Sequence, residues 1–242
     1  MSAGTIRITG ADGDQIEAYA ARPSSSDRRG GVVLIHHMPG YDRWSKEVAR
    51  RFAVDGYDVV MPNLHYRDAP GADPDDAAAA SRANGGVSDQ RLLGDASGAI
   101  DQLRGLDTSN GKVAVLGHCS GGRQAVLVAC NLDVQGAVDC YGAFVVNDAP
   151  SNFPVRMTSL ESQLANLRCP LLGLFGNEDA NPSRKHVDTL DKILTKHGLE
   201  HQFHRYKGAG HGFFAVDRPA YRQEQAVDGY QHIAAFFART IG

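Results

Sequence analysis

The residues most able to do chemistry lie at 117–122, in the segment Gly-His-Cys-Ser-Gly-Gly that directly follows the apolar run 113–116. The spacing Gly-x-Cys-x-Gly is that of a nucleophile elbow, a sharp turn between a strand and a helix that holds a nucleophile strained and exposed. The flanking residues must be small because the turn brings the strand and helix backbones close together. The pattern therefore predicts that Cys119 is the thiol nucleophile of a hydrolase.

A thiol nucleophile needs a base, and the base needs an acid that orients it. Two later segments supply these groups in the order acid, then histidine. Asp179 follows a predicted strand at 171–175, and His211 follows a predicted strand at 202–206. Both lie just past the carboxyl end of a strand, where ligand sites form in open α/β sheets. We therefore predict a triad of Cys119, Asp179 and His211, with Glu178 as the competing acid.

Each of these residues also has a simpler explanation when taken alone. A cysteine between glycines is often structural, Asp179 could cap a helix that begins near Ser183, and His211 could be an ordinary surface histidine. The three motifs together, in the right order at three strand ends, favour catalysis.

A metal site is the other chemical interpretation of this region. Zinc would accept the side chains of His36, His37, His118 and Cys119. However, residues 118 and 119 are adjacent in a tight turn, and nothing supplies the usual ligand spacing. We therefore expect neither a metal nor another cofactor.

The elements that must position these residues alternate between strand and helix. Alternating polar and apolar residues predict an N-terminal hairpin from 5–9 and 15–20. Further strands are expected at 32–35, 57–61, 113–116, 136–138, 171–175 and 202–206, and helices at 44–54, 77–83, 88–106, 121–130, 183–197 and 219–240. This order predicts an α/β fold with a mostly parallel central sheet and helices on both faces. No linker divides the chain, so 1–242 is predicted to be a single domain.

Composition excludes several classes of function. The 242 residues carry a formal net charge of −3, which argues against a nucleic-acid partner. No segment approaches the roughly 18 apolar residues of a membrane span, so no membrane partner is expected. The N-terminus shows no signal peptide, and four cysteines in a chain of this size favour a cytoplasmic protein with reduced thiols.

Taken together, the motifs resemble the dienelactone hydrolase family of α/β-hydrolases, over nearly the whole chain. The resemblance rests on residues 117–122, 176–179, 208–213, and 61–64 with 69–71. It implies the α/β-hydrolase fold, a Cys-Asp-His triad and the opening of enol lactones through an acyl-thiol intermediate. On this basis Cys119 is the nucleophile, His211 the general base and then acid, and Asp179 the residue that orients it.

Two backbone amides are expected to form an oxyanion hole. The N–H of Ser120 follows the nucleophile at the start of a helix, whose positive end favours negative charge. The resemblance implies Met38, in the loop after residue 35, as the second donor. Pro39 has no N–H to offer, which supports Met38.

The chain departs from the family at the residue that contacts the resting nucleophile. The best-described members of the family carry a glutamate there, and this chain carries His37. A histidine can accept a proton or donate a hydrogen bond. We therefore expect His37 near Cys119, where it would tune thiol ionisation or contact substrate.

The family binds a substrate carboxylate with arginines, and its arginine pattern is altered in this chain. One of its arginines matches Ala215 in this chain, with Arg218 three residues further on, and Arg82 is the nearest match to the other. Arg67 is a third possible contact for an anion. Each of these three arginines could equally be a solvated surface side chain, so an anionic substrate stays open.

The sequence thus predicts a carboxymethylenebutenolidase-like hydrolase that opens a small-molecule ester or lactone. A thiolate is itself a good leaving group, so esters with stabilised, enolate-like leaving groups are favoured over amides. The alternatives are a carboxylesterase of broader specificity and a non-catalytic, ligand-binding protein that has kept the fold. Oligomeric state has no signal in the sequence.

Overall fold

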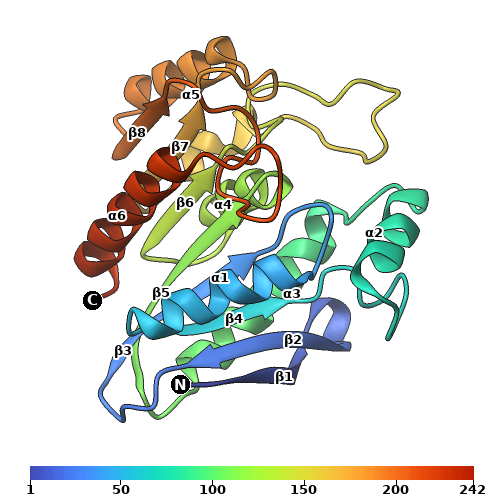
Figure 1. Cartoon of the computed structure of the whole chain (residues 1–242), viewed down its shortest axis with the longest axis vertical. Helices are drawn as coiled ribbons and strands as arrows, with labels where there is room; N and C mark the ends of the chain where they lie inside the picture. The colour runs from blue at the N-terminus through green and yellow to red at the C-terminus, as the bar shows by residue number, and fades with distance from the viewer.

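The computed structural model covers residues 1–242, and one eight-stranded sheet runs through the whole chain (Figure 1). The strands are β1 (Ser2–Thr9), β2 (Gln15–Arg22), β3 (Arg29–Ile35), β4 (Asp58–Pro62), β5 (Ser109–His118), β6 (Gly136–Cys140), β7 (Leu171–Gly176) and β8 (His201–Tyr206). Their order in the sheet is β1-β2-β4-β3-β5-β6-β7-β8. Strand β2 pairs antiparallel with both neighbours, and every other adjacent pair is parallel. The predicted α/β class with a mostly parallel sheet is confirmed.

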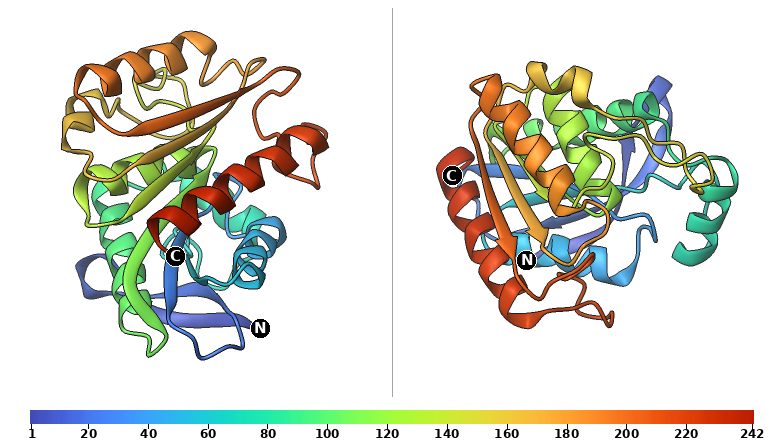
Figure 2. Two further views of the ribbon diagram at one scale, coloured as in Figure 1. Left: turned by 90° about the vertical axis from the view of Figure 1, so that its left-hand side faces the viewer. Right: turned by 90° about the horizontal axis from the view of Figure 1, so that it is seen from above.

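Helices cover both faces of this sheet (Figure 2). Helices α1 (Arg43–Val54) and α6 (Gln223–Thr240) pack on one face, and α3 (Asp89–Arg104), α4 (Ser120–Asn131) and α5 (Arg184–Lys196) pack on the other. Successive side chains of a strand point to opposite faces, so β3 supplies Val32 and Leu34 to one core and Val33 and Ile35 to the other. This double burial explains the continuous apolar run at 32–35. None of the helices combines the length and the hydropathy needed to cross a membrane.

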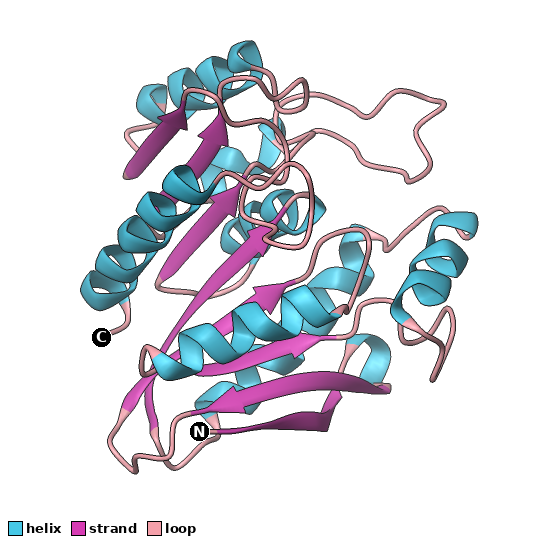
Figure 3. Cartoon of the chain, viewed as in Figure 1, coloured by secondary structure: helices cyan, strands magenta, loops and turns pink.

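Two segments project beyond the carboxyl ends of the central strands (Figures 1 and 3). One carries α2 (Pro74–Ala83), which is longer than the expected helix at 77–83. The other is the loop-rich stretch 147–168, which contains a short 3-10 helix, η2 (Glu161–Asn166). A backbone hydrogen bond from Arg156 N–H to Gly85 O, 3.0 Å long, joins the two segments. They therefore form a common rim around the edge of the sheet where the predicted site lies.

The last helix begins later than its sequence suggests. Helical spacing and Pro219 predict a start at 219, but α6 begins at Gln223. The N–H of Arg222 donates to the carbonyl of Phe213 at 3.1 Å, which ties residues 219–222 to the loop that carries His211. A tertiary contact thus takes the backbone group that the first turn of helix would have used.

Candidate active site

Cys119 occupies the turn between β5 and α4. Its backbone has φ 58° and ψ −123°, a conformation that L-residues rarely adopt. The turn is held by a hydrogen bond from Cys119 N–H to Cys140 O in the neighbouring strand β6, at 3.0 Å. Helix α4 begins at the next residue, Ser120. The structure therefore gives Cys119 the strained strand-to-helix position that the motif predicts.

The glycines around Cys119 are required by close backbone contacts. A Cβ atom on Gly117 would lie 1.9 Å from the carbonyl oxygen of Gly121. A Cβ atom on Gly121 would lie 2.4 Å from the carbonyl oxygen of Ile35, at the end of β3. Both neighbours are backbone atoms, which cannot move aside as a flexible side chain could. The first turn of α4 can approach β5 and β3 this closely only because these side chains are absent.

Replacing Gly117 by alanine is expected to destabilise the protein by about 3 kcal/mol, because the new methyl group overlaps backbone atoms in a packed interior. Gly4→Ala is the matched control, since a Cβ at Gly4 meets no atom within 4 Å. Urea unfolding followed by circular dichroism compares the two variants. Equal unfolding free energies for Gly117→Ala and Gly4→Ala would show that the elbow does not depend on this contact.

The three residues predicted as a triad line the same cavity. His211 Nδ1–H donates to Asp179 Oδ2 at 2.8 Å, and His211 lies close enough to Cys119 to lower the pKa of its thiol. The second oxygen of Asp179, Oδ1, accepts from the Asn181 N–H at 2.8 Å. The Asp179 side chain is only 2% exposed, while that of His211 is 38% exposed. The structure thus brings the predicted acid, histidine and thiol together, with the histidine open to solvent.

The competing roles considered for this loop belong to other residues. Glu178 has a side chain that is 48% exposed and lies 4.0 Å from Arg184, so it does not face His211. Helix α5 is capped by Ser183, whose side chain accepts from His186 N–H, and not by Asp179. The Asp179 side chain is therefore free to hold His211.

The surroundings of Cys119 favour its ionised form. Burial by itself raises the pKa of the thiol, but the hydrogen bond and positive charge of His211 outweigh it, together with N–H groups from Ser120 and Met38. The net result is a pKa below that of an ordinary cysteine. Burial likewise lowers the pKa of His211, but its bonds to Asp179 and Cys119 raise it overall to about 10. Both shifts favour a thiolate at Cys119 paired with an imidazolium at His211.

The other three cysteines lie in the opposite environment. All are buried and free of disulfide bonds. Burial raises the pKa of Cys130 to about 11 and that of Cys169 to about 12, and it raises the pKa of Cys140 as well. Reactivity toward electrophiles follows thiolate character, so Cys119 is the cysteine whose environment favours reaction.

The two residues expected to form an oxyanion hole, Met38 and Ser120, line the same cavity as Cys119. Hydrogen bonding from their backbone N–H groups lowers the pKa of the Cys119 thiol. Ser120 is the first residue of the 12-residue helix α4, so the positive end of the helix dipole lies at the same point.

Cys119 opens into a cavity of about 380 Å³, a size suited to a small organic molecule. Ala143, Phe144, Phe153 and Met157 form its apolar wall, and Phe144 and Phe153 meet edge to face at 4.9 Å. The remaining lining residues are Met38, Ser120, Asp179, Ala180, Asn181 and His211. The reactive groups are thus gathered on one side of a mostly apolar pocket.

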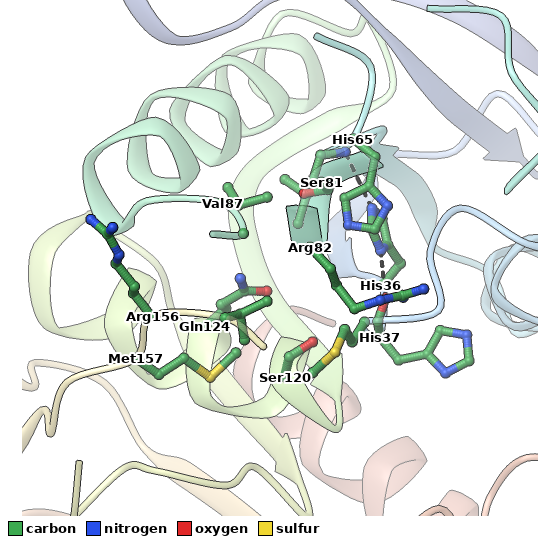
Figure 4. A pocket seen from close by; sticks show the side chains of 14 residues that line it. His36, His37, His65, Ser81, Arg82, Val87, Ser120, Gln124, Arg156 and Met157 are labelled. Atoms are coloured by element: carbon green, nitrogen blue, oxygen red, sulfur yellow. Dashed lines mark hydrogen bonds between the residues drawn. The ribbon is translucent and has the colours of Figure 1, made fainter. Parts of the chain in front are cut away.

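A second and much smaller cavity, about 30 Å³, lies beside the first. Met38, Ser120 and Met157 line both cavities. Figure 4 shows Arg82, from α2, entering this smaller cavity beside the loop of residues 36–38, while Arg156 lies on the opposite side. Both arginines belong to the rim segments described above.

His37 does not make the contact with Cys119 that we expected from the family pattern. Its Nε2 atom lies 2.7 Å from Asp42 Oδ2, its ring packs against Trp44, and it lines the smaller cavity only. Burial raises the pKa of Asp42, but hydrogen bonds from His37 and Ser45 lower it overall to about 2. Because Asp42 is also the N-cap of α1, His37 joins the loop of residues 36–38 to that helix.

Of the three arginines proposed as substrate contacts, only Arg82 lines a cavity beside Cys119. Arg67 is paired with Asp95 at 3.0 Å and with Asp14 at 2.9 Å, and it lines neither cavity. Arg218 is 44% exposed, lies 3.9 Å from Asp42 and also lines neither. Arg82 makes no ion pair and keeps its charge free for an anion. Nothing in the sequence singles out Arg156, because residues 147–168 have the pattern of a loop, and such a pattern does not indicate where the loop folds.

The histidines once considered as zinc ligands have separate partners. His36 hydrogen-bonds the backbone, His37 bonds Asp42, and His118 packs its ring against Trp44 and Phe214. The structure contains no group of three or more histidine, cysteine or acidic side chains arranged to hold a metal ion.

Comparison with known proteins identifies the family. Residues 16–241 match the model of the dienelactone hydrolase family. A "putative carboxymethylenebutenolidase" of Salmonella typhimurium is 31% identical over 252 residues, covering 100% of this chain and 89% of the relative. A "probable 2-oxo-3-(5-oxofuran-2-ylidene)propanoate lactonase" of Bradyrhizobium is 28% identical over 216 residues, covering 88% of this chain and 85% of the relative.

A solved structure agrees with these sequence relatives. The crystal structure of a "putative dienelactone hydrolase" from Klebsiella pneumoniae superposes with a TM-score of 0.85 at 26% identity, over 98% of both chains. The chain therefore belongs to the dienelactone hydrolase family and is a hydrolase of esters or lactones with the α/β-hydrolase fold.

Proposed function

We propose that the protein opens a small dienelactone-like ester or lactone by covalent catalysis at Cys119. His211 acts as the general base and then the general acid, and Asp179 orients it. The observation that carries this proposal is the hydrogen bond between His211 and Asp179 at the wall of the apolar cavity that Cys119 also lines.

The first half of the reaction acylates the thiol. The Cys119 thiolate attacks the substrate carbonyl carbon, and the carbonyl electron pair moves onto the oxygen, where the Met38 and Ser120 N–H groups bind it. The tetrahedral adduct then reforms the carbonyl and expels the ester oxygen. The imidazolium of His211 gives its proton to that oxygen, so the leaving group departs neutral. In a lactone this oxygen stays tethered to the acyl chain.

The second half releases the acyl group. His211, now neutral, takes a proton from a water molecule as that water attacks the thioester carbon. The same two amides bind the second oxyanion, and the carbon–sulfur bond breaks to give a carboxylic acid and the Cys119 thiolate. The imidazolium and thiolate are thereby restored.

The thiolate limits the substrates that can react. A tetrahedral adduct at sulfur expels whichever attached group leaves more readily, and a thiolate leaves far more readily than an amide nitrogen. An enolate oxygen competes well with the thiolate, so enol esters and enol lactones fit this nucleophile. A broader carboxylesterase activity is the second candidate, because Phe144, Phe153 and Met157 offer an apolar surface to neutral acyl groups. A site that only binds ligand would have no need of the thiolate–imidazolium pair.

Trapping the intermediate tests the mechanism directly. The enzyme is mixed with excess p-nitrophenyl acetate, quenched in acid within the first turnovers, digested and analysed by mass spectrometry. We expect one acetyl group on the peptide that contains Cys119, together with a burst of p-nitrophenol. Steady hydrolysis without acylated Cys119, or acylation of another residue, would contradict the proposal.

Arg82 is the residue placed to select an anionic substrate. We propose that its free guanidinium binds a carboxylate on the substrate while the scissile carbonyl lies at Cys119. Arg82→Met is then expected to raise the KM for a carboxylate-bearing ester about 10- to 100-fold, the value of one charge-assisted hydrogen bond. The KM for a neutral p-nitrophenyl ester should stay within about twofold.

Arg218→Met is the matched comparison for this measurement, since Arg218 is exposed and lines neither cavity. Steady-state kinetics on one charged and one neutral ester separate the two arginines. A rise in KM for the charged ester in Arg218→Met, with none in Arg82→Met, would transfer the anion site to Arg218.

A further inference from the structure

His36 lies directly behind the oxyanion loop and is only 2% exposed. The N–H of Leu64 donates to its Nε2 atom at 3.2 Å, and Nδ1 lies 2.8 Å from the carbonyl oxygen of His37. Nε2 accepts a hydrogen bond, so it carries no proton, and the ring hydrogen must sit on Nδ1. Nδ1–H therefore donates to His37 O.

The charge on His36 is fixed as well as its tautomer. Burial lowers its pKa well below the usual range, and the nearby imidazoles of His65 and His37 lower it further. The His37 carbonyl and Asp42 act in the opposite direction but do not overcome burial. The ring therefore stays neutral across the working pH range, with one donor and one acceptor, each of them used.

Two hydrogen bonds hold the peptide unit between His37 and Met38 at its carbonyl oxygen. Its carbonyl oxygen accepts from His36 Nδ1–H at 2.8 Å and from Gly40 N–H at 2.9 Å. In a trans peptide the C=O and N–H bonds point in opposite directions, so fixing the oxygen also aims the N–H. That N–H belongs to Met38, which lines the same cavity as Cys119 and helps to lower the pKa of the Cys119 thiol. A hydrogen bond received at the carbonyl also polarises the unit and strengthens its donor.

We propose that His36 is a positioning residue for the oxyanion hole: its neutral ring links the Leu64 backbone to the His37–Met38 peptide and aims the Met38 N–H at the reacting centre. The inference rests on the proposed function, in which the Met38 N–H binds the developing oxyanion. Figure 4 shows both hydrogen bonds of the ring, one to each side of His36.

Two substitutions of His36 test its two hydrogen bonds separately, because each keeps one bond of the ring and removes the other. The amide of asparagine reaches the position of Nδ1, so His36→Asn can still donate to His37 O but loses the bond with Leu64. The amide of glutamine reaches the position of Nε2, so His36→Gln can still accept from Leu64 but no longer supports the peptide. Each variant buries a polar group and breaks one bond, so their costs in folding stability should be comparable.

The expected result is a selective defect in His36→Gln. Its kcat on p-nitrophenyl acetate should fall about 10- to 100-fold with little change in KM, somewhat less than the loss of a whole oxyanion donor. The pH midpoint for alkylation of Cys119 by iodoacetamide should rise by roughly 0.5 to 1 unit, because the thiolate loses part of one hydrogen bond. His36→Asn should stay within about threefold in kcat and keep the wild-type midpoint.

The alkylation measurement does not need turnover, so it tests the role of His36 even if the proposed hydrolysis fails. His65→Leu is the control, because His65 packs edge to face against His36 at 4.8 Å and its buried Nδ1 has no hydrogen-bond partner. Its alkylation midpoint should equal that of the wild type. Equal shifts in His36→Gln and His36→Asn, or a wild-type midpoint in His36→Gln, would overturn the proposal and leave His36 a purely structural residue.

Discussion

Replacing Cys119 by alanine is expected to lower kcat/KM for p-nitrophenyl acetate by about four orders of magnitude or more. The reason is that Cys119 is the only cysteine lining the cavity, so the variant has no thiol to carry out the covalent step. Binding and the two oxyanion amides survive the substitution, so a small residual rate above the uncatalysed reaction should remain. Initial rates at several substrate concentrations, with active-site titration of the wild type, measure the loss.

Cys130→Ala is the control for this substitution. Cys130 is buried behind the elbow on α4, and its raised pKa keeps it a thiol at neutral pH. We expect its rate to stay within about twofold of the wild type. Labelling with iodoacetamide should reach Cys119 first and abolish activity in step with that labelling. Rapid labelling of Cys130, Cys140 or Cys169 with activity retained would count strongly against Cys119 as the nucleophile.

Cys119→Ser tests whether the charge of the nucleophile matters or only its shape. A serine hydroxyl has the same position but does not ionise at neutral pH, so no ground-state pair with His211 can form. The variant should therefore recover at most a small fraction of the wild-type rate. Full activity in Cys119→Ser would mean that His211 works as a simple base and that the thiolate–imidazolium pair is incidental.

The positions of Cys119, Asp179 and His211 at one edge of the sheet could be predicted from sequence, because each depends on a short local pattern. Cys119 needs glycines that allow a strand and a helix to touch, and Asp179 and His211 each need only to follow a strand of a parallel sheet. Parallel strands place their carboxyl ends at one edge, so three separate local patterns become one site. The outcome is the 2.8 Å contact between His211 and Asp179, with Cys119 lining the same cavity.

The substrate contacts could not be predicted in the same way, because they depend on where long segments fold. Arg67 looked free in sequence, yet its partners are Asp95, 28 residues later, and Asp14, 53 residues earlier. Arg82 enters the smaller cavity only because α2 and the stretch 147–168 meet above the sheet. No local pattern states either fact, since both are tertiary.

His37 shows a subtler limit of sequence reasoning. It lies next to Met38 in the chain, and the family pattern suggested that its side chain faces Cys119. The side chain of His37 is held by its hydrogen-bond partner, the partly buried carboxylate of Asp42 at 2.7 Å. Asp42 is fixed in turn because it caps α1 through the Ser45 N–H. The N-cap of a helix, five residues after His37, thus determines where the His37 side chain lies.

Asp179→Asn is expected to lower kcat by about three to four orders of magnitude while leaving the protein folded. The amide keeps the shape of the carboxylate but removes the negative charge that favours an imidazolium at His211, and it can hold the ring in the wrong tautomer. In the wild type the pKa of His211 is raised to about 10, and that of Cys119 is lowered. The rate should therefore rise with pH as Cys119 ionises and fall as His211 loses its proton near pH 10.

The pKa of Cys119 sets the acid limb of the pH–rate profile, and the pKa of His211 sets its alkaline limb. Asp179→Asn should move both limbs. Without the charge of Asp179 the pKa of His211 drops, so the alkaline limb of the pH–rate profile should move to lower pH and the active range should narrow from that side. The weaker imidazolium also stabilises the thiolate less, so the acid limb should move upward. Profiles of kcat/KM, together with the pH dependence of Cys119 alkylation, measure the two limbs independently.

Glu178→Gln is the matched control, since the Glu178 side chain is 48% exposed and lies beside Arg184 rather than His211. If the profile of Asp179→Asn were unchanged, or if Glu178→Gln lost more activity, Asp179 would not be the acid that orients His211.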